Sequence, residues 1–257
     1  MQTIFANNHY TSADRKISFF KRHLPSLFFY LKLFSIVWRA GQLAKNGKYT
    51  DGKWISTSKE ILLLLESVGV KLEIKNLHIL KNLTKPVVFI GNHMSTLETF
   101  ILPYIIQSVT NVTFVVKKEL ISYPVFGHVM KNRNPIVVNR VNPRDDFKVV
   151  LEEGKERLAR GISVIIFPQT TRTNAFDPKE FNSIGVKLAK NANAPIIPMA
   201  LKTDAWGTGK IIKDFGKINP AKKVTIVFGN EIIVDDNGKE AQAKIIEFIA
   251  KNLAAAS

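Results

Sequence analysis

The 257-residue chain contains no cysteine. This absence excludes disulfide bonds, a cysteine nucleophile and a thiolate metal site, and it fits a cytoplasmic setting. Acidic side chains are also scarce, because 21 Asp and Glu oppose 37 Lys and Arg and leave a formal net charge of +16 at pH 7. Such an excess of positive charge favours a polyanionic neighbour, either a nucleic acid or an anionic membrane.

A long hydrophobic run is missing as well. The most apolar N-terminal stretch lies between His23 and Arg39, is about 15 residues long and is interrupted by Lys32, whereas a membrane-spanning helix needs roughly 20 apolar residues. No small-residue cleavage site follows it, so a removable signal peptide is not expected. Aromatic side chains flanked by Lys and Arg favour a helical pair lying in the interface of an anionic membrane, on its cytoplasmic face. The alternative is a buried amphipathic helix that covers the core.

Several catalytic and binding motifs are absent. Residues 47–53 have the spacing of a phosphate-binding P-loop, but Trp54 stands where Ser or Thr is required and no apolar strand precedes them. The chain has no G-x-S-x-G sequence, which speaks against a serine hydrolase. Neither metal-ligand spacing nor an RNA-binding signature is found, so we expect no metal and no nucleic-acid partner.

Short apolar strands alternate with helices along most of the chain. Strands are expected at 71–75, 86–90, 112–116, 136–138, 162–167, 195–201 and 224–228, and helices at 58–68, 96–107, 144–160, 183–190 and 238–253. This alternation predicts an α/β fold with a largely parallel central sheet flanked by helices. Residues 45–57, rich in Gly, Lys and Ser, are the expected linker. They separate an N-terminal helical membrane-association segment (1–56) from an α/β domain (57–257).

The most informative segment, Asn92 to Glu98, directly follows the apolar strand expected at 86–90. A histidine at the end of a buried strand, with a carboxylate five residues later, can form a general base. The carboxylate fixes the tautomer of the ring and leaves the other ring nitrogen free to accept a proton. Because residues five apart diverge on a helix, we expect His93 on the turn and Glu98 in the first turn of the next helix. The alternative for His93 is a strand-end histidine that only caps a carbonyl.

Three further blocks follow in order. The first block begins with Lys117 and Lys118, continues through Tyr123-Pro124-Val125-Phe126-Gly127 and a short apolar strand, and ends at Arg140. The second block is Phe167-Pro168-Gln169-Thr170-Thr171-Arg172. The third block surrounds Pro195-Ile196-Ile197-Pro198. With the His93 segment in front, this order resembles the glycerolipid acyltransferase family that includes the lysophosphatidic acid acyltransferases. The resemblance covers about residues 86 to 230. Four ordered blocks are much more specific than any one of them.

The sequence departs from the family pattern in two places. Glu98 stands where the family usually has Asp, which adds a methylene but keeps the charge. Gln169 and Thr170 stand where it usually has Glu and Gly. Gln169 still donates and accepts hydrogen bonds but is uncharged, and Thr170 removes the backbone freedom of a glycine. These changes indicate a different acceptor or a locally rebuilt pocket.

The resemblance implies a catalytic pair, His93 and Glu98, and the following substrate-contacting residues: Asn92, Lys117, Lys118, Arg140, Gln169, Thr170, Thr171 and Arg172. Arg140 and Arg172 match the family's phosphate-contacting positions, and arginine forks suit a phosphate. Lys117 and Lys118 are helpers at the pocket mouth. Arg140 could instead be an ordinary surface arginine of a basic protein.

The implied activity is transfer of a fatty acyl group to a lysophospholipid, by default 1-acyl-sn-glycerol 3-phosphate, to give phosphatidic acid. The donor is acyl-CoA or acyl-carrier protein, so that the partners are an acyl thioester, the acceptor, anionic membrane lipids and, for the second donor, acyl-carrier protein. No cofactor is expected. The alternatives are another lipid acceptor or a non-catalytic lipid-binding relative.

Overall fold

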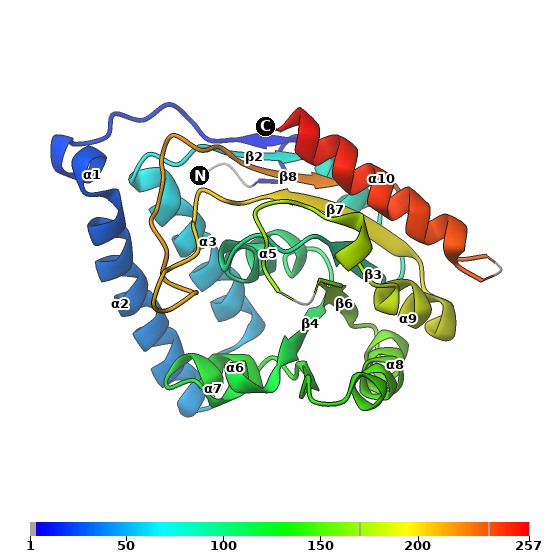
Figure 1. The fold of residues 1–257 in the computed structure, drawn as a ribbon. Helices are drawn as coiled ribbons and strands as arrows, with labels where there is room; N and C mark the ends of the chain where they lie inside the picture. Colours follow the sequence, from blue (N-terminus) through cyan, green and yellow to red (C-terminus); the bar gives the residue numbers. More distant parts are fainter. Residues whose placement is uncertain (1–3, 170, 236, 257) are drawn as a thin grey trace.

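The computed structural model describes residues 4–169, 171–235 and 237–256 (Figure 1). Within these residues, eight strands form one sheet: β1 (Tyr10–Thr11), β2 (Leu72–Lys75), β3 (Val88–Gly91), β4 (Val112–Lys117), β5 (Ile136–Val138), β6 (Ser163–Ile166), β7 (Ile196–Lys202) and β8 (Val224–Phe228). Their order across the sheet is β1-β2-β8-β7-β3-β6-β4-β5. Pairs β1–β2 and β7–β8 are antiparallel, and every other neighbouring pair in the described chain is parallel. The expected α/β fold with a largely parallel sheet is confirmed.

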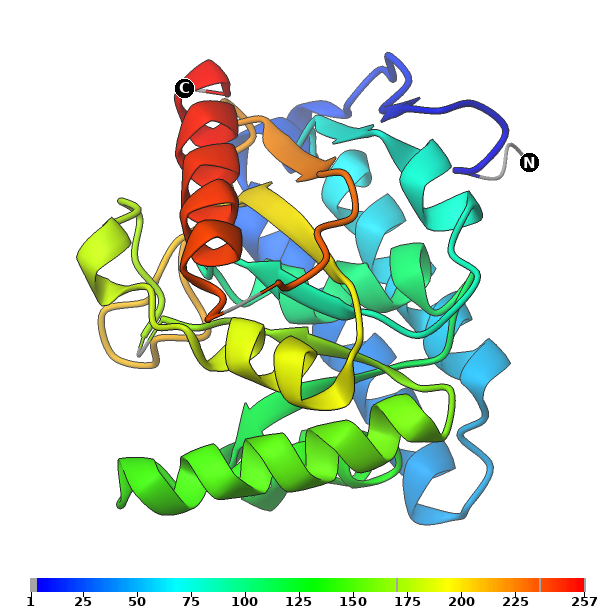
Figure 2. The same ribbon diagram turned by 90° about the vertical axis from the view of Figure 1, so that its right-hand side faces the viewer.

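Helices cover both faces of this sheet. They are α1 (Phe19–His23), α2 (Pro25–Lys45), α3 (Asp51–Ser67), α4 (Leu77–Lys81), α5 (Leu97–Ile106), α6 (Lys118–Ser122), α7 (Phe126–Lys131), α8 (Pro143–Ala159), α9 (Ile184–Ala192) and α10 (Lys239–Ala255), with a 3₁₀ turn at Pro178–Glu180. In the view turned by 90°, α8, α9 and α10 lie in the foreground on one side (Figure 2). Helices α3 and α5 lie behind them, across the sheet.

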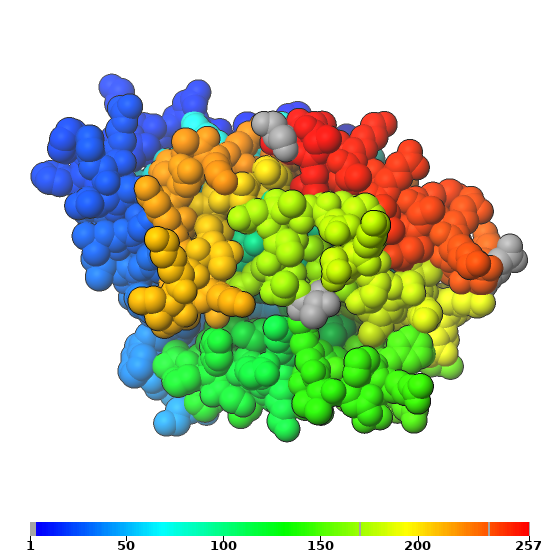
Figure 3. Space-filling model, viewed as in Figure 1, coloured from blue at the N-terminus to red at the C-terminus, as the bar shows by residue number. Residues whose placement is uncertain are grey.

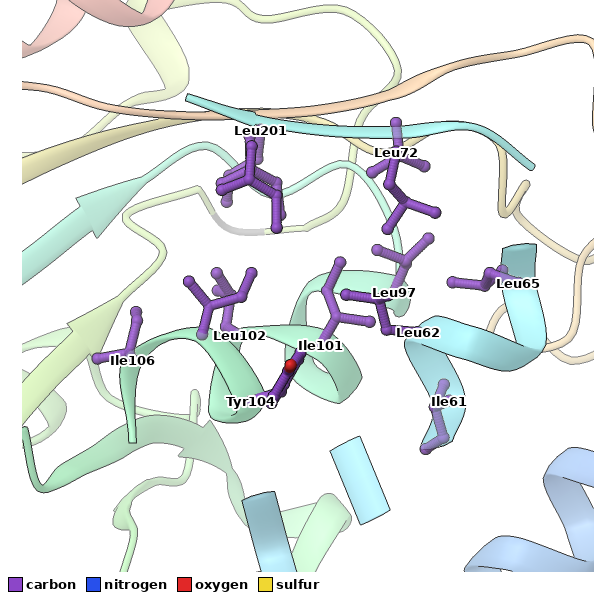
Figure 4. Close-up of a cluster of buried hydrophobic side chains, with 14 of the residues drawn as sticks. Ile61, Leu62, Leu65, Leu72, Leu97, Ile101, Leu102, Tyr104, Ile106 and Leu201 are labelled. Atoms are coloured by element: carbon purple, nitrogen blue, oxygen red, sulfur yellow. The ribbon is translucent and has the colours of Figure 1, made fainter. Parts of the chain in front are cut away.

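The two faces are specified by alternation along the buried strands. In β3, Val88 and Ile90 belong to the hydrophobic cluster under α8, α9 and α10, whereas Phe89 belongs to the cluster under α3 and α5. Successive side chains of a strand point to opposite faces, so a strand that is apolar at every position must be covered on both. Figure 4 shows part of the larger cluster, where Leu62 of α3 and Ile101 of α5 are close together beneath Leu72 and Leu201 of the sheet.

Most element boundaries agree with the sequence to within about two residues, but the third helix does not. Residues 45–57, predicted to be a linker, are mostly helical, because α3 begins at Asp51 rather than at residue 58. Thr50 caps this helix by accepting the Lys53 backbone N–H at 3.4 Å, and Trp54 is buried on its inner side. The composition of residues 45–57, rich in Gly, Lys and Ser, is typical of a linker, so the prediction missed the helix start that Thr50 caps. The boundary expected between residues 56 and 57 therefore falls inside α3.

Helix α2 has two apolar faces. One face, which includes Phe29, Leu33 and Ile36, is buried in the same core as α3 and α5. A second row is exposed to solvent and repeats at intervals of three and four residues, as one stripe of a helix does: Leu24, Leu27, Leu31, Phe34 and Trp38. No helix in the described part of the chain is both long and apolar enough to cross a membrane. Helix α2 thus helps to build the core and also presents an apolar stripe outside it.

Candidate active site

Five neighbouring strands, β7, β3, β6, β4 and β5, run parallel to one another, so their carboxyl ends lie along one edge of the sheet. In open α/β sheets, ligands bind at this edge. The segment beginning at Asn92 follows β3, the segment 167–172 follows β6, Lys117 ends β4 and Arg140 follows β5. The topology therefore brings the sequence-predicted site residues, which are up to 80 positions apart, to one side of the molecule.

His93 and Glu98 form the predicted pair. The ring atom Nδ1 of His93 lies 2.7 Å from Oε2 of Glu98. His93 is on the turn after β3 and Glu98 is in the first turn of α5, as the five-residue spacing requires. Because an ionised carboxylate only accepts hydrogen bonds, Nδ1 carries the proton in this pair and Nε2 keeps its lone pair.

The carboxylate of Glu98 is completely buried and fully engaged. Its Oε1 accepts the backbone N–H groups of Met94 and Ser95, both at 3.0 Å, and the hydroxyl of Thr203 at the end of β7. Its position at the N-terminus of α5 adds the favourable helix dipole. These donors compensate the cost of burying a charge and fix the carboxylate against His93.

The imidazole of His93 is held on a second side by Phe167. The two rings are stacked, with centroids 4.5 Å apart and an angle of 6° between their planes. The side chain of His93 is 20% exposed, and Nε2 has no hydrogen-bond partner among the described residues. Glu98 and Phe167 thus orient a ring whose free nitrogen is open to a substrate, which is the geometry that a general base needs.

Gln169 supports the same turn from inside the protein. Its Oε1 accepts the backbone N–H of His93 at 2.6 Å, and its Nε2 donates to the Thr173 hydroxyl at 2.9 Å. The backbone N–H of Thr173 in turn donates to the His93 carbonyl at 3.0 Å. Gln169 is buried, so the structure places it behind the catalytic turn rather than on an open surface. The sequence predicts a different acceptor or a locally rebuilt pocket at Gln169 and Thr170. In the folded chain, Gln169 joins this loop to the His93 turn.

Two other predicted substrate contacts have different surroundings. Asn92 is buried and its amide makes two hydrogen bonds to Leu201 of β7, one to the carbonyl at 2.9 Å and one from the N–H at 2.8 Å. Asn92 therefore fastens the turn to the sheet. Thr171 is exposed on the loop, and Thr170 lies outside the described residues.

Arg172 points toward the same turn. Its guanidinium forms an ion pair with Asp214 at 2.7 Å and donates to the hydroxyl of Thr96, the residue before α5. Asp214 lies on the long loop between β7 and β8. The sequence did not single out either partner. Asp214 belongs to no motif, and Thr96 lies inside the Asn92 to Glu98 segment, but its contact with Asp214 exists only in the folded chain.

Lys117 belongs to a cluster of cations at this edge. Its pKa is lowered, first by burial and then by repulsion from Arg140, and to a smaller extent from Arg172 and Lys213, while Glu119 acts in the opposite direction. Clustered cations of this kind are typical of a site that binds an anion. Lys118, the next residue, is exposed at the start of α6.

Arg140 is held in an unusual backbone conformation. Its φ is +57°, in the left-handed region that non-glycine residues rarely adopt. The carboxylate of Asp146 accepts the backbone N–H groups of Asn139 at 2.8 Å and of Arg140 at 2.7 Å, which holds the turn in place. Strained residues supported in this way are concentrated at functional sites, which favours a binding role for Arg140 over that of an ordinary surface arginine.

Comparison with known proteins agrees with this geometry. The family model described as Acyltransferase matches residues 71–202, which is more than half of the chain and contains the His93 turn, Lys117, Arg140 and Arg172. The chain belongs to the acyltransferase family. This confirms the resemblance seen in the ordered sequence blocks.

Individual members of this acyltransferase family show the same relationship. The chain is 33% identical over 177 residues to a 1-acyl-sn-glycerol-3-phosphate acyltransferase of Pseudomonas aeruginosa, which covers 69% of this chain and 65% of the relative. It is 29% identical over 164 residues to the enzyme of the same name from Cocos nucifera, covering 63% and 51%. The match thus spans between half and two thirds of the length of these relatives.

The fold is also shared with a solved structure. The crystal structure of the 1-acyl-sn-glycerophosphate (LPA) acyltransferase from Thermotoga maritima superimposes with a TM-score of 0.70 and 17% sequence identity, over 91% of this chain and 95% of that one. At this identity the likeness concerns the fold. The acyltransferase fold therefore extends beyond the segment matched by the family model, to nearly the whole chain.

Proposed function

We propose that this protein transfers a fatty acyl group from an acyl thioester to the hydroxyl of a lysophospholipid, with 1-acyl-sn-glycerol 3-phosphate as the default acceptor and phosphatidic acid as the product. The observation that carries this proposal is the His93–Glu98 pair, whose free Nε2 lies at the same sheet edge as Arg172 and the cations around it. The pair supplies a base, and the cations supply a place for the acceptor's phosphate. The relatives named above carry this activity in their names.

The reaction needs one base and no covalent intermediate on the protein. Nε2 of His93 accepts the proton of the acceptor hydroxyl while its oxygen attacks the thioester carbonyl, and the new C–O bond gives a tetrahedral intermediate. Glu98 stabilises the imidazolium formed in this step, since its carboxylate is 2.7 Å away. Collapse of the intermediate breaks the C–S bond, and the imidazolium returns the proton to the thiolate. The ester and the free thiol are the products, and His93 is regenerated.

The acceptor is held through its phosphate. Arg172, Arg140 and Lys117 come from three different strand ends, so they can surround one phosphate group from several directions. An arginine can give two parallel hydrogen bonds to two phosphate oxygens, which fixes orientation as well as affinity. Because Gln169 lies behind the His93 turn and not in this cluster, its presence leaves lysophosphatidic acid as the favoured acceptor. The donor, acyl-CoA or acyl-carrier protein, follows from the reaction type alone.

We also propose that the protein acts at the cytoplasmic face of an anionic membrane. The apolar stripe of α2 is continued by the β7–β8 loop, where Phe215 lies 5.5 Å from Phe34, ring centre to ring centre, and Ile211 and Ile212 are exposed. Figure 3 shows this loop beside the N-terminal helices on the surface. Phe215 directly follows Asp214, which pairs with Arg172. The apolar surface therefore borders the proposed phosphate site, so that a lipid acceptor need not leave the interface to reach His93.

The acceptor assignment is tested by offering the full chain a panel of lysolipids with palmitoyl-CoA and with palmitoyl-acyl-carrier protein in mixed micelles. Products are identified by mass spectrometry, with a preparation of the His93→Ala variant as the blank. We expect phosphatidic acid from lysophosphatidic acid in preference to products from neutral or zwitterionic lysolipids. Product from another lysolipid alone would transfer the proposal to that acceptor. Absence of any His93-dependent product would favour a non-catalytic lipid-binding relative.

A further inference from the structure

The long loop between β7 and β8 places an acidic residue inside the cation cluster. Its base is closed by a β-bridge between Trp206 and Ile218, both buried. The indole N–H of Trp206 donates to the backbone carbonyl of Asp214 at 3.0 Å. The backbone of Asp214 is therefore fixed by the core, and only its side chain is free to change direction.

The carboxylate of Asp214 has one strong partner. Its Oδ1 pairs with Arg172 at 2.7 Å and accepts the Thr96 hydroxyl at 3.3 Å, while its Oδ2 accepts the Tyr123 hydroxyl at 3.4 Å. Arg172 also binds Thr96, so Asp214, Arg172 and the turn before α5 form one connected group. Both Arg172 and Asp214 are about one fifth exposed, so solvent and solutes can reach the pair.

Asp214 thus takes one terminal nitrogen of the arginine that the proposed function assigns to the acceptor's phosphate, and Thr96 takes the other. A carboxylate and a phosphate compete for the same guanidinium hydrogens, because each presents two oxygens in a plane. If both anions stayed on Arg172, they would repel each other at short distance. Rotation of the Asp214 side chain removes this conflict without movement of the loop, because the backbone is held by Trp206.

We propose that Asp214 is a positioning and specificity residue, an internal counter-anion that holds Arg172 toward Thr96 before the acceptor binds and is exchanged for the acceptor's phosphate. This inference rests on the proposed function for the identity of the acceptor but not for the binding of phosphate. Exchange lowers the affinity of the site for every external anion, because an anion can bind Arg172 only during the fraction of time that Asp214 leaves it. It also discriminates against lysolipids that lack an accessible phosphate, since they cannot displace the carboxylate.

The direct test is binding of inorganic phosphate and of glycerol 3-phosphate to the full chain, measured by isothermal titration calorimetry at low ionic strength. Asp214→Asn keeps the shape of the side chain but removes the competing charge, and we expect it to bind both ligands about three- to tenfold more tightly than the wild type. Asp214→Glu, which restores the charge, should return affinity toward the wild-type value. Glu240→Gln is the matched control for loss of one negative charge, because Glu240 is exposed and pairs with Lys244 on α10.

Repeating the Asp214→Asn comparison in a protein that carries Arg172→Gln distinguishes exchange at Arg172 from a general electrostatic effect of the lost charge. In the presence of Arg172→Gln, Asp214→Asn should change phosphate affinity by less than twofold, because the competitor no longer has its target. Unchanged or weaker phosphate binding by Asp214→Asn, with an unchanged melting temperature, would overturn the inference. So would an equal gain in the Arg172→Gln background.

Acyl transfer gives a second, independent readout. For Asp214→Asn we expect the KM for lysophosphatidic acid to fall while kcat changes less, whereas a merely structural role would lower kcat and stability together. If phosphate binding responds as expected but no acyl transfer is found with any acceptor, the proposed function fails and the role of Asp214 in anion binding stands. If transfer is found but phosphate binding does not respond, only the role of Asp214 fails.

Discussion

The side-chain oxygen of Gln169 accepts the backbone N–H of His93 at 2.6 Å, and this bond joins the loop after β6 to the turn after β3. The opposite end of the same amide donates to Thr173, whose hydroxyl donates onward to the carbonyl of Ala175 at 2.7 Å. A glutamate at position 169 could accept from His93 but could not donate to Thr173. The amide therefore serves the His93 donor and the Thr173 acceptor together. A carboxylate could only accept from the Thr173 hydroxyl, which would have to turn away from Ala175.

Replacement of Gln169 tests this account of the loop. Gln169→Ala removes both bonds and leaves the half-buried N–H of His93 without its partner, so we expect a loss of about 1–3 kcal/mol in the free energy of unfolding. Gln169→Glu keeps one bond and should cost about 1 kcal/mol. Urea denaturation measures both values, and kcat should fall in the same order. Equal stability of Gln169→Ala and the wild type would contradict the supporting role.

Arg172→Lys tests the phosphate assignment. Lysine keeps the charge but loses the two-pronged donor, so the KM for the acceptor should rise about tenfold while the KM for the thioester changes little. Steady-state kinetics with each substrate varied in turn gives both constants. A larger rise for the thioester would place Arg172 at the donor instead.

Lys117 is predicted to be held in the site against electrostatic repulsion. Its pKa is lowered in the folded protein by burial and by its cationic neighbours, which means that folding disfavours its charged form. This unfavourable contribution is fully present at pH values below the lowered pKa, where Lys117 is charged in both states, and it disappears as the pH rises past the unfolded value. Lys117→Gln should therefore raise the melting temperature at pH 7 and also raise the acceptor KM about three- to tenfold.

The neighbouring lysine provides the comparison for this variant. Lys118→Gln removes the same charge at an exposed position, so it should change both quantities less. A lower melting temperature for Lys117→Gln, with an unchanged acceptor KM, would show that Lys117 is a structural residue.

The exposed stripe of α2 is predicted to bind the membrane. Truncation at residue 57 cannot test this, because it would cut α3 and remove Phe29 and Leu33 from the core. A triple replacement of Leu31, Phe34 and Trp38 by Ser leaves the buried face intact and should reduce liposome binding at least tenfold, as each exposed apolar side chain contributes about 1 kcal/mol or more to insertion.

Flotation with vesicles of phosphatidylglycerol and phosphatidylcholine measures this binding. Ile233→Ser, at an exposed apolar residue between β8 and α10, is the matched control and should float like the wild type. Equal flotation of the triple variant would exclude the stripe as the membrane surface.

The sequence was sufficient where local pattern determines structure. The strand–turn–helix arrangement of His93 and Glu98 follows from the buried strand before them and the five-residue spacing. Strand β8 agrees with its predicted bounds at both ends, because its five residues are all β-branched or aromatic. The parallel sheet then explains why distant strand ends meet at one edge. The start of α3 was missed because its cap, Thr50, and its buried Trp54 lie in a stretch that looks like a linker by composition.

Other parts of the site depend on tertiary contacts that no spacing reveals. Thr203 reaches Glu98, and Asp214 reaches Arg172, from strands and loops more than 40 residues away along the chain. Asn92 and Gln169 occur in motifs that suggested substrate contact, but both are buried and bonded within the protein. Motif membership identified residues near the chemistry, and only the folded geometry separates those that face the substrate from those that support them.

The central claim is that His93 is the base, and one pair of variants tests it most directly. Acyl transfer to lysophosphatidic acid is measured for His93→Ala and for His78→Ala, which removes an exposed histidine from α4. We predict that His93→Ala lowers kcat by about two to four orders of magnitude without loss of folding, while His78→Ala keeps wild-type activity. A His93→Ala protein that retains full activity would contradict the account, because no other residue in it performs the proton transfer.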